Sequence, residues 1–130
     1  AAMQARFART LGRIRIARGD VEAFVGAWLT EPKAHVYFAP PSRVPGIGAF
    51  AKSLARRGAR LDLRTQALYD ARAMYVNGER VTIPAAARAA LRRFADRRVL
   101  PAREAASLDA NAHSLLHDWY RHGWLHLGTA

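Results

Sequence analysis

An Asn-Gly pair at positions 77 and 78 constrains the fold of this chain more than any other sequence feature. Both central residues of a type I′ turn adopt positive φ, which asparagine and glycine tolerate. Such a pair between two β-rich runs is therefore typical of a tight hairpin. The pair stands in the centre of the stretch 61–83, with Tyr75-Val76 before it and Glu79-Arg80-Val81 after it. The pair predicts two antiparallel strands joined by a two-residue turn.

Further strand material precedes the hairpin. Leu61 and Leu63 alternate with charged residues, which is the period of a half-buried strand. Leu68 and Tyr69 add another run, and residues 70–72 are expected to form a turn between this run and the hairpin. The whole segment 61–83 thus predicts one small antiparallel sheet.

On both sides of this segment the hydrophobic pattern is helical. Helices are expected over residues 50–57, 84–98, 101–107 and 110–122, and a last strand over residues 124–127. Gly58 can end the first of these helices with positive φ, Pro84 suits the start of the second, and Asp109 can cap the last. Three closely linked helices on a small sheet favour an α+β fold with a winged-helix-like domain.

The N-terminal part of the chain predicts a helical appendage. Residues 2–16 carry apolar residues at helical spacing among several arginines. The next helix ends before Glu31-Pro32, and its apolar stripe includes Phe24, Val25, Trp28 and Leu29. This stripe can pack on the body of the protein or on a second copy, since aromatic residues are enriched at interfaces. These four residues are therefore candidates for a dimer interface.

Proline and glycine mark a linker over residues 39–48. The expected organisation is a helical dimerisation segment over residues 1–38, the linker, and the winged-helix-like domain over residues 49–130. The chain begins in the manner of a helix already under way, which suggests a piece of a longer protein.

The formal net charge of +11 favours a polyanionic partner such as nucleic acid. Arginine outnumbers lysine 19 to 2, however, and a GC-rich genome would impose the same bias on any protein. Candidate polyanion contacts gather near the helix over residues 84–98; they are Arg88, Arg92, Arg93, Arg97 and Arg98. The helix over residues 110–122 offers one arginine and an aspartate, which makes a poor base reader. The alternative function is a stand-alone basic winged-helix protein that binds nucleic acid without sequence preference.

Motifs for catalysis are missing from the sequence. It has no cysteine, no Gly-x-Ser-x-Gly elbow, no P-loop, and no His-x-Asp or His-x-Glu pair for non-haem iron. His113 and His117 have the i, i+4 spacing of a zinc helix but lack the glutamate between them, so capping or solvent-facing histidines are favoured. The acids, Asp62 among them, are scattered between arginines, which indicates surface ion pairs. We expect no catalytic residue, metal or cofactor in this chain, and no membrane span or signal peptide.

Three stretches resemble one known family. Residues 24–41, with Trp28-Leu29, Glu31-Pro32 and Pro40-Pro41, resemble the segment after the catalytic barrel of bacterial cupin-type ribosomal oxygenases. The turn over residues 75–79 looks like the hairpin of their C-terminal winged-helix domain. The tail, from residues 91–100 to residues 122–124, is similar to its closing helices.

These oxygenases are JmjC-like enzymes that use Fe(II) and 2-oxoglutarate to hydroxylate an arginine of a large-subunit ribosomal protein. The resemblance implies a cytoplasmic parent protein hydroxylase whose N-terminal barrel, missing here, holds both cofactors. It also implies a homodimer formed by the helices before the linker, and a terminal domain for docking or structure. No catalytic residue carries over, because no position here matches the iron motif. Ribosomal RNA or an acidic surface stays open as a partner for the positive charge.

Overall fold

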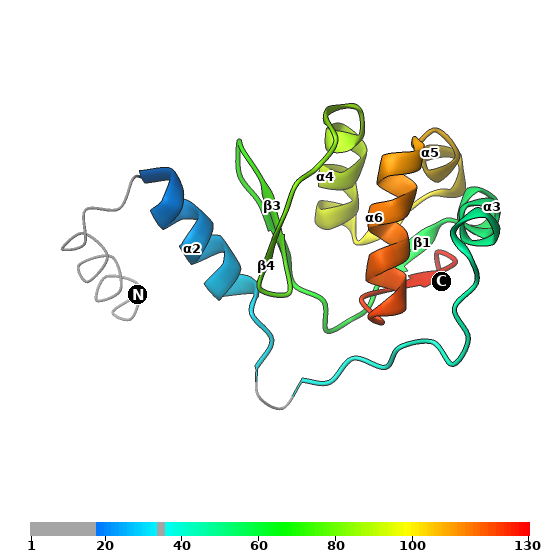
Figure 1. The fold of residues 1–130 in the computed structure, drawn as a ribbon, viewed down its shortest axis with the longest axis horizontal. Coiled ribbons are helices and arrows are strands. Elements are labelled where there is room, and N and C mark those ends of the chain that lie inside the picture. Colours follow the sequence, from blue (N-terminus) through cyan, green and yellow to red (C-terminus); the bar gives the residue numbers. More distant parts are fainter. Residues whose placement is uncertain (1–17, 34–35) are drawn as a thin grey trace.

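A computed structural model describes residues 18–33 and 36–130 (Figure 1). Its regular elements follow one another as α2 (Arg18–Thr30), α3 (Ile47–Arg57), β1 (Ala59–Leu61), β2 (Ala67–Tyr69), β3 (Met74–Val76), β4 (Glu79–Val81), the 3₁₀ turn η1 (Ala85–Ala87), α4 (Arg88–Arg97), β5 (Val99–Leu100), α5 (Ala102–Ala106), α6 (Ala110–Arg121) and β6 (Leu125–Leu127). The helix expected over residues 2–16 lies outside the described residues. The expected α+β class is confirmed.

The hairpin has the turn that the sequence predicts. Asn77 and Gly78 have φ angles of 48° and 88°, and the flanking strands β3 and β4 pair from Val76–Glu79 outward to Met74–Val81. Strand β2 pairs with the other edge of β3. In the turn that joins these two strands, the Asp70 carboxylate accepts hydrogen bonds from the N–H groups of Arg72 and Ala73. The predicted hairpin and the turn over residues 70–72 are thus confirmed.

The single sheet expected from the sequence is wrong, because β1 belongs to a second sheet of order β5-β1-β6. Strand β1 ends at Leu61, and the chain then turns, with the N–H of Thr65 donating to the carbonyl of Asp62. Leu63 lies in this turn and is 94% exposed, so the predicted alternation of Leu61 and Leu63 does not occur. The two-residue strand β5 follows Arg98, whose left-handed conformation (φ 66°) turns the chain out of α4.

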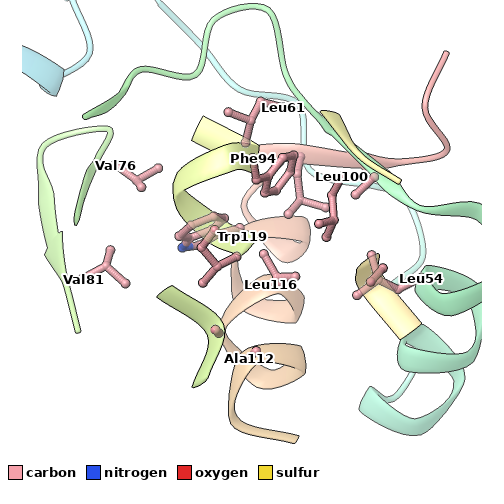
Figure 2. Close-up of a cluster of buried hydrophobic side chains, with 14 of the residues drawn as sticks. Leu54, Leu61, Val76, Val81, Phe94, Leu100, Ala112, Leu116 and Trp119 are labelled. Atoms are coloured by element: carbon pink, nitrogen blue, oxygen red, sulfur yellow. The ribbon is translucent and has the colours of Figure 1, made fainter. Parts of the chain in front are cut away.

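The core lies between the helices and the two sheets. The predicted helical stripes are buried as expected, with Phe50 and Leu54 from α3, Leu91 and Phe94 from α4, and Leu116 and Trp119 from α6. Figure 2 shows Val76 and Val81 of the hairpin pointing toward Trp119. The caps at Gly58 and Asp109 are also present, the latter accepting the N–H of Ala112 at 2.9 Å.

Strand β3 is buried on both of its faces. Met74 and Val76 point into the core, whereas Tyr75, one residue out of phase with them, faces α2. Helix α2 contacts all three strands of the β2-β3-β4 sheet, so this sheet lies between α2 and the remaining helices (Figure 1). The sheet thereby joins the N-terminal helix to the body of the protein.

The segment between α2 and α3 carries no regular element over residues 36–46, as its proline content leads one to expect. It is nevertheless fastened to the body. Arg64 donates to the carbonyl of Tyr37 at 2.7 Å, and Phe38 packs edge-on against Trp124. A Cβ on Gly123 would lie 2.6 Å from the carbonyl oxygen of Ala39, so only glycine allows this approach. The division into three segments at residues 38 and 48 stays a prediction.

Candidate interaction surfaces

Helix α2 makes its closest contacts with the sheet through Gly26 and Thr30 rather than through its apolar stripe. At Gly26 the backbone lies against the ring of Tyr75, so closely that a Cβ would stand 2.5 Å from the ring atom Cδ2. Thr30 is fully buried, and its hydroxyl accepts the N–H of Gly78 at 2.9 Å. The same hydroxyl lies 3.0 Å from the carbonyl of Gly26, to which it can donate. The Asn-Gly turn therefore has a second role, because it also binds the C-terminal end of α2.

Because Gly26 and Thr30 face the sheet, the four candidate interface residues lie along the flanks of α2. Phe24 and Leu29 are 43% and 42% exposed, and Val25 and Trp28 are half-buried. The sequence left open whether this stripe packs on the body or on a second copy. The structure brings part of each side chain to the body and leaves part of each at the surface.

Two grooves separate these flanks from the sheet. One, of about 570 Å³, is lined by Val25 and Leu29 on the helix and by Leu68, Tyr69 and Tyr75 on the strands. The other, of about 440 Å³, lies beside the Asn-Gly turn and includes Phe24 and Trp28. Leu68 and Tyr69 are 44% and 39% exposed and extend the first groove. Sequence reasoning used these two residues only as strand material, since a short alternating run does not reveal which face stays open.

The five candidate polyanion contacts differ in their surroundings. Arg88 and Arg97 are exposed. Arg92 donates to the carbonyl of Asp70 at 3.0 Å and lies 5.2 Å above the ring of Tyr69. Arg93 pairs with Glu104 at 3.1 Å, and Arg98 donates to the carbonyls of Asp62 and Thr65. Arg98 also lies beyond the end of α4, so the five do not form one helical face.

The histidines at the C-terminal end lie next to oxygen atoms of the protein. The pairs are His113 Nε2 with the carbonyl of Ala105, His117 Nε2 with that of Pro45, His122 Nδ1 with that of Asp118, and His126 Nε2 with the carboxylate of Asp62. Among the residues that the structure describes, no three His, Cys, Asp or Glu side chains gather as metal ligands.

Asp62 is buried, which corrects the expectation of a surface ion pair. Its carboxylate accepts hydrogen bonds from the backbone N–H and the guanidinium of Arg64 at 2.9 Å, and lies 2.7 Å from His126. Burial by itself raises the pKa of Asp62, but the hydrogen bonds from Arg64 and His126 outweigh it and hold the pKa well below its usual range. The ionised carboxylate thus connects the end of β1 to β6.

No helix over residues 18–33 and 36–130 is long and apolar enough to cross a membrane.

Comparison with known proteins gives a family and a fold. The family described as ROXA-like winged helix matches residues 13–126. The crystal structure of Escherichia coli ribosomal oxygenase YcfD superposes with a TM-score of 0.75 at 16% identity, covering 95% of this chain and 34% of that one. Structures of E. coli YcfD with cobalt and succinic acid and with cobalt and 2-oxoglutarate give TM-scores of 0.75 and 0.73, each at 17% identity.

This chain spans about a third of the length of those structures. At such identities the likeness shows a shared fold. None of the curated proteins matches this chain in sequence.

Proposed function

Because this chain belongs to the ROXA-like winged-helix family, we propose that it is the winged-helix part of a ribosomal oxygenase and serves dimerisation and docking rather than catalysis. The observation that carries the proposal is the fold shared with ribosomal oxygenase YcfD over 95% of this chain and only 34% of the other.

The parent protein in this proposal is a cytoplasmic cupin-type, JmjC-like hydroxylase of a ribosomal protein. The binding of cobalt and 2-oxoglutarate by YcfD supports Fe(II) and 2-oxoglutarate as its cofactors. The described histidines lie against carbonyl and carboxylate oxygens in pairs rather than in a ligand set, so we assign both cofactors to a barrel outside this chain.

The assignment is tested by reading the coding frame upstream of Ala1. The proposal expects about two hundred further codons, the size of a barrel domain, including His-x-Asp and a later His. A frame that continues without those ligands would remove the oxygenase proposal. The docking role is tested on the parent by deleting residues 49–130. Hydroxylation of the whole ribosomal protein should fall, whereas turnover of 2-oxoglutarate without that substrate should persist.

For dimerisation we propose the flanks of α2, through Phe24, Val25, Trp28 and Leu29. The support is the pair of grooves beside the helix and the partial exposure of all four side chains. The groove at Val25 and Leu29 is lined mainly by apolar side chains, whereas the groove at Phe24 and Trp28 also includes Glu31 and Glu79. In a two-fold symmetric dimer the same patch serves both copies, and a helix flanked by grooves can be self-complementary in this way.

The test is the mass of this chain in solution, measured by light scattering. The wild type should be a dimer and Trp28→Glu a monomer with an unchanged circular dichroism spectrum. Leu63→Glu is the matched control, because Leu63 is 94% exposed in the loop after β1, outside the lining of either α2 groove, and should leave the dimer intact. A wild-type monomer, or a Trp28→Glu variant that remains dimeric, contradicts the proposal.

A further inference from the structure

Three arginines surround one small pocket between the β2–β3 turn and α4. Arg72 comes from the turn, and Arg88 and Arg92 stand one helical turn apart on α4. The apolar side chains of Ala73, Met74 and Ile83 complete the lining together with Tyr69. We call this place the three-arginine pocket. Arg88 and Arg92 were already candidates for anion contact from the sequence, whereas Arg72 was not, since only the folding of the hairpin brings it there.

Arg92 is held in place by two contacts on the same wall. Its Nη2 donates to the carbonyl of Asp70 at 3.0 Å, and its guanidinium lies 5.2 Å above the ring of Tyr69. The Tyr69 hydroxyl in turn donates to Asp96 at 2.8 Å, and this hydrogen bond raises the pKa of Tyr69. A guanidinium fixed by a carbonyl and an aromatic ring keeps its remaining N–H groups available in a defined direction.

The nearby carboxylates are engaged elsewhere. Asp96 accepts the hydroxyl of Tyr69, and Asp70 accepts the N–H groups of Arg72 and Ala73 and the hydroxyl of Tyr75. Within the part of the chain that the structure describes, none of the three guanidinium groups forms an ion pair with a carboxylate. Three positive charges therefore meet without a compensating anion in ion-pair contact.

We propose that the three-arginine pocket binds a phosphoryl group of a nucleic-acid strand. The space inside it, about 10 Å³, is roughly that of one water molecule. It is lined mainly by apolar side chains and cannot enclose a phosphate group. The phosphate therefore binds at the rim, to the guanidinium groups, whose planar forks match phosphate geometry. The ligand is recognised by its phosphate and lies outside the pocket.

The charge of the whole chain favours a strand over a lone phosphate ion. The chain has a net charge of +11, which attracts a polyanion more strongly than a single anion. Arg93 and Arg98 do not line the pocket and contact Glu104 and backbone carbonyls instead, so we exclude them from the site. This inference does not depend on the oxygenase parent.

The test is binding of a fluorescently labelled single-stranded RNA to this chain, measured by polarisation at several salt concentrations. Arg72→Ala and Arg88→Ala should each weaken binding about tenfold, the scale of a lost hydrogen bond to a charged group. Each should also lower the slope of log K against log salt by about one. Arg92→Lys, which keeps the charge but loses the fork, should weaken binding as well. Arg56→Ala is the matched control, because exposed Arg56 lies on α3 and not at the pocket.

Equal losses in Arg56→Ala and Arg72→Ala would mean diffuse charge attraction and would overturn the pocket. Inorganic phosphate at millimolar concentration should compete with RNA in the wild type and less in Arg72→Ala. Binding of phosphate without binding of RNA would overturn the strand as ligand. Binding of polyglutamate as tight as that of RNA would overturn it too, in favour of an acidic protein surface.

Discussion

The contact between Gly26 and Tyr75 makes the sharpest prediction about how α2 is held. A Cβ at position 26 would lie 2.5, 2.6 and 2.7 Å from three atoms of the Tyr75 ring. Carbon atoms pack best at about 3.5–4.0 Å, so the ring or the helix must move by roughly 1 Å to admit one methyl group. Tyr75 is only 3% exposed and its hydroxyl donates to Asp70, which leaves the ring little room to yield.

Two opposing effects decide the sign of Gly26→Ala. Alanine in a helix interior is more favourable than glycine by about 0.5–1 kcal/mol. Overpacking a tight contact costs about 1–3 kcal/mol. We therefore expect Gly26→Ala to lower the free energy of unfolding by about 1 kcal/mol, measured by urea unfolding followed by circular dichroism.

Gly48→Ala is the matched control, because a Cβ at that position in α3 has nothing within 4 Å. It should be neutral or slightly stabilising, by a few tenths of a kcal/mol. A second control removes the ring: in a Tyr75→Leu background, Gly26→Ala should lose most of its penalty. If Gly26→Ala stabilised the chain as Gly48→Ala does, the close seating of α2 on the sheet would be refuted.

Three further substitutions test other contacts. Thr30→Val keeps the shape but leaves the N–H of Gly78 without its acceptor, so the free energy of unfolding should fall by about 1–3 kcal/mol in urea unfolding, whereas Thr30→Ser should retain most of it. Gly78→Ala puts a side chain on a residue whose φ is 88°, with its Cβ 3.2 Å from the Cα of Glu31, and should lower the free energy of unfolding by about 1–2 kcal/mol. Asn77→Gly keeps the turn and should not have this effect. Asp62→Asn should lose about 1–3 kcal/mol at pH 7. Because the folded-state pKa of Asp62 is lowered, the wild type keeps its advantage above the ordinary value of 3.8 and loses it as the pH falls below that value. Below that pH the unfolding curves of the wild type and Asp62→Asn should converge. The control is Asp118→Asn, because Asp118 is exposed. A difference in stability that does not change with pH would contradict an ionised Asp62 carboxylate.

The sequence indicated most of the local structure correctly, for physical reasons that act over a few residues. Positive φ at Asn77 and Gly78 and the cap at Asp109 depend on the residues at those positions and their immediate neighbours. The buried stripes of α3, α4 and α6 follow from the 3.6-residue period, which places Leu91 and Phe94 on one face. The winged-helix class followed from these elements and is confirmed by the family match.

Prediction failed where a residue depends on distant parts of the chain. Leu63 has the spacing of a strand residue, but β1 ends before it in a turn whose Thr65 N–H donates to the carbonyl of Asp62. Distant Arg98 holds this turn by donating to the carbonyls of Asp62 and Thr65. Asp62 itself resembles any surface acid in sequence, and it is buried because His126, 64 residues later, meets it in the fold. Strand β5 is too short to carry a period of its own.

The sequence by itself determined which segments are helix, hairpin and turn, since these follow from side-chain period and backbone freedom. Only the tertiary structure decided which face of α2 meets the sheet. Hydrophobic periodicity points to the Phe24 and Trp28 stripe, but the sheet takes Gly26 and Thr30, because close packing and a buried hydrogen bond favour the smallest and the polar residue. Tertiary structure likewise gathered Arg72, Arg88 and Arg92 around one pocket. Charge alone cannot show such a site, because it does not reveal which arginines already have partners.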